Sequence, residues 1–424
     1  MKSQAENSIT LREEIIASLD NPRQLEKVYR ENKTNFKKEF KMIYPRIQDK
    51  TISQIWNERL NFENEDISWG TTREWTFIII ASIISGLIAK IAQFASIDPE
   101  FYYTRNLAFV VFPMLSLYFA WRQQLPPKRL VPVLIAMVIS AIYINLLPNN
   151  PKSDTLMLAC IHMPLFMWAL LGFTYTGGSL NDYTKRLDFL RFNGDLVVMG
   201  TIIAIAGMGL SMVTIGLFKL IDLNIGEFYF ENIAIWGLAS LPLIATYLVL
   251  INPQLVNKVS PVIARVFTPL VLIMLVAYVI AVIYTGKDPY NDREFLMVFN
   301  LLIIGVMAII FFSIAELAKN PENKTGIALL FCLSIVTILV NGYALSAIVF
   351  RISSWGITPN RLAVLGANIL MLTNLLLVTY KLFNTIRDKN EMDSVEKSIA
   401  TFLPVYILWS ILVTFVFPVV FSFK

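Results

Sequence analysis

Long apolar segments alternate with short polar ones over most of the chain, from about residue 75 onward. Each apolar segment has the length that a helix needs to cross about 30 Å of hydrocarbon at 1.5 Å per residue. The apolar positions are continuous and do not alternate, so they predict helices and not the strands of a barrel. We expect eleven membrane-spanning helices, at 75–94, 106–121, 130–147, 155–175, 195–218, 233–251, 266–285, 295–317, 326–350, 361–380 and 399–422.

The polar N-terminal region has a different pattern. An Asp-Asn-Pro sequence ending at Pro22 predicts a capped helix start, and Leu25 and Tyr29 follow one helical turn apart. We therefore expect a module of short cytosolic helices over 1–70, followed by a multi-pass transmembrane domain over 71–424. The fold class is all-α, a polytopic transmembrane helical bundle.

Composition and charge support a membrane protein. Hydrophobic residues make up 56% of the chain and charged residues 16%, and the net charge is +5. The first 74 residues hold 13 basic and 13 acidic residues, so the positive excess belongs to the apolar part. Basic loops beside apolar spans fit a lipid bilayer with anionic phospholipid, and they give no reason to expect a nucleic-acid partner.

The distribution of Lys and Arg among the loops predicts an orientation. With a cytoplasmic N-terminus, the inner loops carry twice as many basic residues as the outer ones. The inner set is Arg122, Lys128, Arg129, Lys185, Arg186, Arg191, Lys258, Arg265, Lys319, Lys324, Lys381, Arg387, Lys389 and Lys397. An odd number of spans then places the C-terminus on the opposite, outer side of the membrane.

Charged residues inside the predicted spans are few. Proton- or cation-coupled transporters usually keep a carboxylate deep in the membrane, and Asp195 and Glu316 lie only at span ends. Lys90 lies about four residues from the outer end of the first span, where we expect it to snorkel toward the interface. The stretch at 179–194, which precedes the span at 195–218, is typical of an amphipathic helix lying in the interface.

Two groups of polar or soft side chains could bind ligands. Cys160, Met163 and Met167 share one helix face beside His162, the only histidine. This combination suits Cu(I), but Met is also common core filler and a lone His next to a Pro can bond a backbone carbonyl, so we expect neither a metal nor a cofactor. The in-membrane amides Asn300, Asn341, Asn368 and Asn374 are more typical of interhelical hydrogen bonds than of a substrate site.

The loop between the ninth and tenth spans is the strongest candidate for a binding site. It carries Arg351 and Arg361 and no carboxylate, and Gly356 permits a turn. Thr358 and the following proline predict a helix start, which puts Arg361 in a first turn where the helix dipole disfavours a cation unless an anion is near. We predict an anion-binding site at Arg351, Trp355, Thr358, Asn360, Arg361 and Asn368, with Asn368 on the same face about 10 Å deeper.

Three kinds of anion could pair with these arginines. Asp292 or Glu294 of another outer loop and a lipid phosphate are the two alternatives in which the arginines only anchor the loop. A substrate carboxylate or phosphate is the third, and the sequence leaves all three open.

Several stretches resemble one family. They are "NPRQLEKVYRENKTNFKKEF", "IWNERLNFENEDISWG", "YTKRLDFLRFNGDL" and above all "RISSWGITPNRLAVLGANIL". Together they are similar to an uncharacterised bacterial membrane family, familiar from Bacteroidetes and filed as a domain of unknown function. The resemblance implies a multi-pass inner-membrane protein with Arg351, Trp355, Gly356, Thr358, Asn360 and Arg361 as the family signature. It implies no activity, substrate or cofactor.

No nucleophile–base pair, phosphate-binding loop or zinc motif favours an enzyme. We therefore expect an integral membrane protein that is transporter-like or binds lipid or anion at the loop arginines. The alternative is a non-transporting signalling or assembly protein whose N-terminal region docks a protein partner.

Overall fold

The computed structural model describes residues 11–31, 33–62, 70–150, 152–179, 181–219, 223–257, 259–286, 290–317, 323–387 and 392–423. These residues are almost entirely helical and form no strand, so the expectation of an all-α fold is confirmed. The chain divides into two compact units, Met1–Trp69 and Gly70–Lys424.

The described residues of the N-terminal unit, 11–31 and 33–62, form four short helices. They are a helix over 11–18, α2 (Pro22–Glu31), α3 (Lys33–Ile47) and α4 (Thr51–Phe62). The helix α2 begins at the predicted proline, and Asn21 caps it by accepting a hydrogen bond of 3.2 Å from the Gln24 backbone. Apolar side chains of all four helices form one core: Leu11, Ile15, Leu19, Leu25, Val28, Tyr29, Phe36, Phe40, Ile43, Trp56 and Leu60.

The second unit, which we call the membrane unit, contains the long apolar helices. In chain order it holds α5 (Thr72–Ala89), α6 (Ile91–Phe94), α7 (Pro99–Arg122), α8 (Pro127–Leu146), α9 (Asp154–Tyr175), α10 (Tyr183–Lys219), α11 (Gly226–Tyr229), η1 (Phe230–Ala234), α12 (Ile235–Ile251), α13 (Pro253–Asn257), α14 (Ser260–Thr285), α15 (Arg293–Leu317), α16 (Lys324–Trp355), α17 (Pro359–Arg387), α18 (Met392–Ile411), η2 (Leu412–Val416) and α19 (Phe417–Val420). Within the described residues, ten helices are long and apolar enough to cross a membrane.

The remaining predicted span, 106–121, lies in α7, which is long enough but less apolar than those ten. Its 24 residues rise about 36 Å. It runs the full height of α5 in the opposite direction, because Tyr102 donates to the carbonyl of Ile88 at one end and Arg122 pairs with Glu74 at the other. The buried Arg105 is one reason for its lower apolar content.

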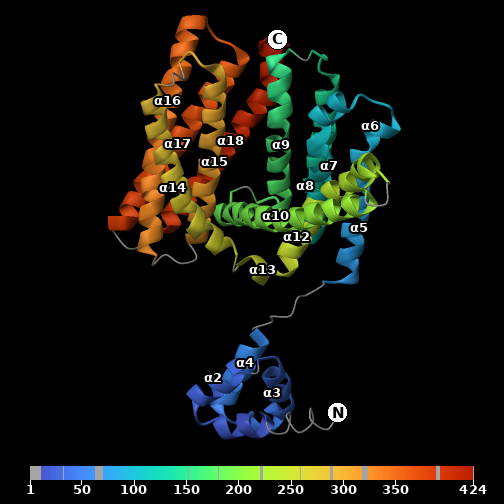
Figure 1. Ribbon diagram of the computed structural model, residues 1–424, viewed down its shortest axis with the longest axis vertical. Coiled ribbons are helices and arrows are strands. Elements are labelled where there is room, and N and C mark those ends of the chain that lie inside the picture. Colours follow the sequence, from blue (N-terminus) through green and yellow to red (C-terminus); the bar gives the residue numbers. More distant parts are fainter. Residues whose placement is uncertain are drawn as a thin grey trace. The chain divides into compact units, whose positions relative to one another are not determined.

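The long helices form two groups on either side of α9 (Figure 1). The first group packs α5, α7, α9, α10 and α12 around one apolar cluster, and the second packs α14 to α18 around another. The helix α9 contacts α7 of the first group, α17 and α18 of the second, and α8, which packs beside it. It therefore lies at the junction where helices far apart in the sequence meet.

Small residues permit two of the closest helix contacts. A Cβ at Gly86 of α5 would lie 2.1 Å from the ring of Trp236 in α12, and one at Gly366 of α17 would lie 2.0 Å from the ring of Trp409 in α18. Neither tryptophan could pack there against any larger residue. This is the usual role of glycine between membrane helices, where close approach supplies the packing energy.

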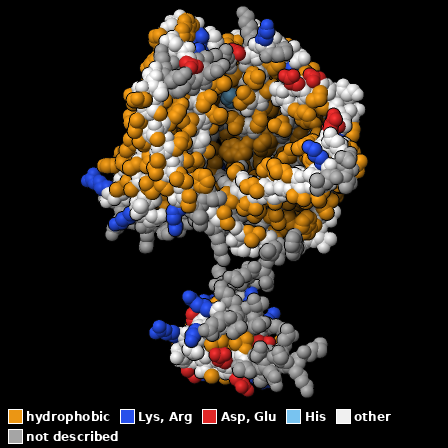
Figure 2. All heavy atoms as spheres, viewed as in Figure 1, with side chains coloured by type: hydrophobic (Ala, Val, Ile, Leu, Met, Phe, Trp, Pro, Cys, Tyr) orange, Lys and Arg blue, Asp and Glu red, His pale blue; other side chains and the backbone are white. Residues whose placement is uncertain are grey.

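The surface of the membrane unit is that of a protein embedded in lipid. Figure 2 shows hydrophobic side chains over most of the visible face, with Lys, Arg, Asp and Glu mainly toward its upper and lower margins. Exposed apolar residues such as Ile139, Leu210 and Leu339 lie on the long helices. Such an extent of apolar surface fits contact with lipid chains.

The stretch predicted as an amphipathic helix at 179–194 and the span at 195–218 belong to one helix, because α10 runs without a break from Tyr183 to Lys219. One local expectation is wrong. Lys90 does not snorkel: it is 3% exposed, and its Nζ donates to the carbonyl of Glu231 at 2.7 Å and to Asn232 Oδ1 at 3.0 Å. A neighbouring helix end lies close enough to satisfy the ammonium inside the protein.

Candidate functional site

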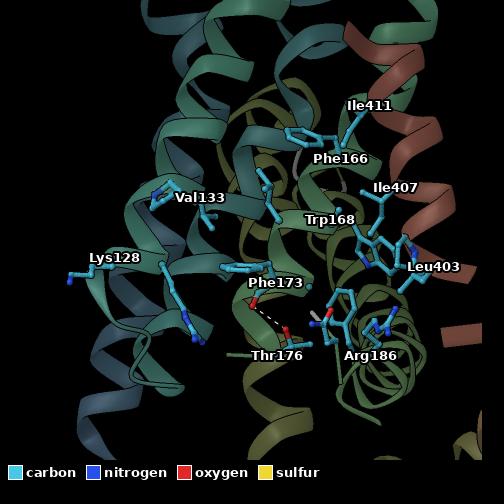
Figure 3. Close-up of a pocket in the computed structure, with 18 residues that line it drawn as sticks. Lys128, Val133, Phe166, Trp168, Phe173, Thr176, Arg186, Leu403, Ile407 and Ile411 are labelled. Carbon is cyan, nitrogen blue, oxygen red and sulfur yellow. Dashed lines mark hydrogen bonds between the residues drawn. The ribbon is translucent and has the colours of Figure 1, made fainter. Parts of the chain in front are cut away.

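A pocket of about 730 Å³ lies between α8, α9, the start of α10 and α18 (Figure 3). We call it the α8–α18 pocket. Its walls are mostly apolar and aromatic, and its volume is that of a typical small-molecule site. The lining residues are Lys128, Arg129, Pro132, Val133, Phe166, Trp168, Ala169, Leu170, Gly172, Phe173, Thr176, Asn181, Arg186, Phe189, Leu403, Pro404, Ile407 and Ile411.

Polar side chains gather at one end of this pocket. Figure 3 shows Phe166 and Ile411 at one end and Thr176 and Arg186 at the other. Lys128 and Arg129 belong to the same polar end, where α8 begins, although Lys128 points away from the cavity in Figure 3. The lining includes three basic residues and no Asp or Glu, so the polar end has a positive electrostatic potential.

Arg186 is held in place by a backbone carbonyl that becomes available because of Pro404. A proline has no N–H, so Pro404 leaves the carbonyl of Ala400 without its usual partner in α18. The Nη1 of Arg186 donates to this carbonyl at 2.8 Å, while its Nε is buried and has no hydrogen-bond partner among the described residues. One edge of the guanidinium is therefore anchored, and the Nε edge has hydrogen-bonding capacity left for a ligand.

Arg129 is fixed from the other side of the pocket. Its Nη1 donates to the carbonyl of Gly177 at 3.1 Å, in the turn after α9. Gly177 and Gly178 both have positive φ, 66° and 77°, a conformation that glycine adopts without strain. A Cβ at Gly178 would lie 2.9 Å from Arg129 Cδ, so the glycine also leaves room for this side chain.

Hydrogen bonds fix the aromatic wall. The indole Nε1 of Trp168 donates to Asn193 Oδ1 at 2.9 Å, and the Trp168 and Phe189 rings lie 5.0 Å apart. A Cβ at Gly172 would lie 2.9 Å from the Phe189 ring. The helices α9 and α10 therefore approach closely here, and the wall is largely pre-formed.

The apolar end of the pocket is closed where α18 changes to the π-helix η2. The Tyr143 hydroxyl of α8 donates to the carbonyl of Thr414 at 3.2 Å, and its ring lies 5.0 Å from that of Phe415. Phe415 also packs edge-on against Phe166, at 5.2 Å between ring centroids. A π-helix shifts the hydrogen-bond register, which makes carbonyls available to outside donors such as Tyr143.

An ion pair lies beside the polar end. Arg191 Nη2 pairs with Glu396 Oε1, joining α10 to α18, and Glu396 is buried. Arg191 Nη1 also pairs with Asp188 Oδ1 at 3.3 Å, so this guanidinium is shared by two carboxylates, neither of which lines the pocket. Asp182 caps the start of α10 by accepting from the Thr184 backbone at 3.0 Å, and hydrogen bonds led by the Thr184 hydroxyl lower the pKa of this exposed carboxyl.

The predicted loop site has a different geometry from that of a ligand pocket. Arg361 Nη1 donates to the carbonyls of Trp355 and Gly356, at 2.9 Å and 2.7 Å. These carbonyls belong to the C-terminal end of α16, where the helix dipole favours a cation. The helix end therefore supplies the negative partner that the first-turn position of Arg361 requires.

Both arginines of this loop lie close to the ring of Trp355. The guanidinium carbon of Arg351 lies 5.0 Å from the Trp355 ring centroid and that of Arg361 lies 5.7 Å from it. Thr358 caps α17 by accepting from the Arg361 backbone at 3.3 Å, as its sequence position predicts. Gly356 has a φ of 78°, as the turn requires. The side chain of Glu294, one of the expected partners, lies outside the described residues.

Two of the predicted site residues lie apart from these arginine contacts. Asn368 is 1% exposed, and its Nδ2 donates to Asn300 Oδ1 at 2.7 Å and to the carbonyl of Val364 at 2.9 Å. It thus makes the interhelical hydrogen bond expected of in-membrane amides. Asn360 is partly buried in the first turn of α17.

The soft side chains of α9 belong to the protein interior. Cys160, Met163 and Met167 pack in the core between α7, α8 and α9, and His162 Nδ1 bonds to the carbonyl of Leu158 at 2.9 Å. Within the described residues, no group of three or more His, Cys, Asp or Glu side chains could hold a metal ion.

Sequence reasoning missed the α8–α18 pocket. Its basic residues were counted only as loop charges, and its walls come from four segments that are far apart in the chain. One signal was present: Pro404 inside a predicted span implies a carbonyl that needs an outside donor. No family model matches the chain, and the comparisons find no similar curated protein or solved structure.

Proposed function

We propose that this integral membrane protein binds an acidic amphiphile, a lipid-like molecule with an anionic head, in the α8–α18 pocket. The observation that carries the proposal is the combination of an apolar, aromatic cavity with a polar end that holds Lys128, Arg129 and Arg186 and no carboxylate. This makes the protein lipid-handling or transporter-like, as its sequence suggests, but with the ligand at a different place from the predicted loop.

The charge of the pocket supports an anionic head. Basic pockets between transmembrane helices on the cytoplasmic side are a recurrent mode of anionic lipid recognition. Arg186 is suited to an oxyanion, since a guanidinium presents parallel N–H donors to the oxygens of a carboxylate or phosphate. The inner-loop excess of Lys and Arg supports a cytoplasmic position for this end of the membrane unit.

The arrangement of the helices supports entry from the bilayer. The pocket has α9 at its back, with α8 and α18 on its two sides (Figure 3). The outward residues Val131 and Ile135 of α8 and Leu408 of α18 are exposed and apolar, as lipid contact requires. An amphiphile could therefore move into the pocket without its chain entering water.

The test compares two double variants that remove the same charge. The pocket pair is Arg129→Ala with Arg186→Ala, and the loop pair is Arg351→Ala with Arg361→Ala. Native mass spectrometry of the purified full-length proteins would report which lipids stay bound. We expect an acidic amphiphile on the wild type and the loop pair, and its loss from the pocket pair.

Two results would overturn the proposal. Loss of the amphiphile from the loop pair alone would place the site at Arg351 and Arg361. Equal lipid binding by all three folded proteins would leave neither set of arginines with a binding role. If the pocket pair does not fold, Arg129→Lys with Arg186→Lys keeps the charge, loses the guanidinium geometry and should bind more weakly.

A partner-docking role of the N-terminal region is the second candidate. The observation that favours it is that the N-terminal unit has an apolar core of its own. A deletion of residues 1–69 tests it. Loss of function with unchanged lipid binding would support docking, whereas intact function would exclude it.

A further inference from the structure

We infer that the α8–α18 pocket accepts a single hydrocarbon chain and that the contact of Tyr143 and Phe415 limits its length. The inference rests on the proposed function, because it concerns the chain of the amphiphile whose head lies near Arg186. It assigns the ligand to single-chain acidic amphiphiles, such as a long-chain carboxylate or a one-chain phosphate ester.

The volume of the pocket favours one chain. At the roughly 30 Å³ that one water-sized group occupies, the cavity of about 730 Å³ holds about 24 non-hydrogen atoms. One acyl chain and a small head fit this number. A phospholipid with two long chains is about twice as large, so its second chain would have to remain outside in the bilayer.

The distance between the two ends sets a chain length. The lining residues of α9 run from Thr176 at the polar end to Phe166, ten residues and therefore about 15 Å of helix. An extended chain advances roughly 1.2 Å per bond, so about 12 methylene groups span this distance.

The apolar end of the pocket is formed by side chains that pack against one another, and not by a single surface side chain. Phe166 lines the pocket, and the ring of Phe415 packs behind it at 5.2 Å. Phe415 is fixed in turn by Tyr143, whose ring lies 5.0 Å away and whose hydroxyl donates to the carbonyls of Thr414 and Phe415 at 3.2 Å and 3.4 Å. These contacts tie α8 to η2, so a longer chain meets packed aromatic rings.

A series of n-alkyl phosphates of increasing chain length tests the inference. Binding to the purified full-length protein would be measured for the wild type and for Phe415→Ala. Within the pocket, affinity should rise with each methylene, by at most roughly fourfold. We expect the affinity to reach its maximum at about 12 carbons, the chain length that fits between Thr176 and Phe166. In Phe415→Ala the maximum should move to longer chains.

Two controls accompany the series. Phe421→Ala removes an aromatic ring that packs against Phe417 on another side of the same segment, so it should leave the maximum unchanged. Phe415→Leu is a milder substitution if the alanine variant does not fold. A dialkyl lipid with the same phosphate head should compete poorly with the best single-chain ligand.

The outcomes separate the two proposals. Binding without a length maximum, an unchanged maximum in Phe415→Ala and Phe415→Leu, or tighter binding of the dialkyl lipid would overturn the inference and leave the proposed function standing. Absence of binding for every chain length would instead overturn the proposed function.

Discussion

Arg186 of α10 donates its Nη1 hydrogen bond to the backbone carbonyl of Ala400, the carbonyl that Pro404 leaves without a partner in α18. The bond joins two helices through residues that are 214 positions apart in the chain. It also explains why Arg186 is rigid at the end of an apolar pocket. A backbone carbonyl in hydrocarbon needs a hydrogen-bond donor and the guanidinium needs an acceptor, so each group satisfies the other.

This relationship predicts coupling between the two positions. Arg186→Ala should lower the free energy of unfolding by about 1–3 kcal/mol, because it leaves the Ala400 carbonyl buried without a donor. In a Pro404→Ala background the new backbone N–H can satisfy that carbonyl, so the cost should be smaller by roughly 1 kcal/mol. Denaturant unfolding in detergent for the four proteins of the cycle measures the difference. Strict additivity would show that the bond does not contribute to stability.

Two glycines give a matched pair of substitutions. Gly366→Ala would place a methyl group 2.0 Å from the Trp409 ring and should destabilise the protein by about 1–3 kcal/mol, because α17 and α18 must separate. Gly342→Ala in α16 meets no atom within 4 Å and should be neutral or stabilise by up to about 1 kcal/mol through helix propensity. Thermal unfolding in detergent compares them. Equal melting temperatures for the two variants would contradict the close contact.

The loop arginines predict a local effect on α16. Arg361→Ala removes two hydrogen bonds to the carbonyls of Trp355 and Gly356, so the last turn of α16 should open more often. Hydrogen exchange of the amides at 352–356 should accelerate by roughly tenfold, the equivalent of one hydrogen bond. Arg351→Ala is the control, because it also removes a contact with the Trp355 ring but no bond to these carbonyls. Unchanged exchange in Arg361→Ala would refute the capping role.

The N-terminal unit should lose stability in acid because of Glu26. Arg59 donates to its carboxylate at 2.7 Å and Arg30 at 2.8 Å, and these bonds lower the pKa of Glu26 below its ordinary value of 4.5. The lower folded-state pKa means that the stabilisation is present above the unfolded-state value and is lost as pH falls through the folded-state value. Glu26→Gln should therefore destabilise the unit at neutral pH and have a progressively smaller effect below about pH 4.

Fluorine NMR of 5-fluorotryptophan at Trp56 measures this in the full chain. Trp56 lies in the core of the N-terminal unit, and Arg59 lies 4.5 Å above its ring, so its signal reports unfolding of this unit alone. Glu58 of α4 is exposed in the same unit, so Glu58→Gln serves as a control with the same change of charge. A constant effect of Glu26→Gln from neutral to strongly acid pH would exclude the linkage.

The fold could be predicted because hydrocarbon leaves the backbone few choices. Apolar segments such as 326–350 must be helical, and α16 contains that range. Helix caps could also be predicted, because they depend only on residues at one helix end, as at Asn21 and Thr358. The limits came from charged side chains whose hydrogen-bond partners are backbone carbonyls. Lys90 and Arg361 both donate to carbonyls, and residue types do not show where an available carbonyl will lie.

The α8–α18 pocket could not be predicted for the same reason. Trp168, Arg186 and Leu403 become neighbours only through the packing of α9, α10 and α18. The sequence pattern marks each as part of a span or a basic loop, and nothing in the spacing states that they face one cavity. The predicted anion site at Arg351 and Arg361 remains a prediction, to be decided by the loop pair described above.

The π-helix at Leu412–Val416 makes the chain tolerant of a change of length at this point. A π-turn accommodates one residue more than an α-turn, so deletion of one of these five residues would restore the α-helical register. The residues that follow would keep their direction, whereas the same deletion in a regular α-helix would turn them by about 100° around the helix axis. Phe417 would therefore stay against Trp409, but Tyr143 would lose the carbonyls that the π-turn makes available to it. A single-residue deletion here should thus be far less damaging than one in the regular part of α18.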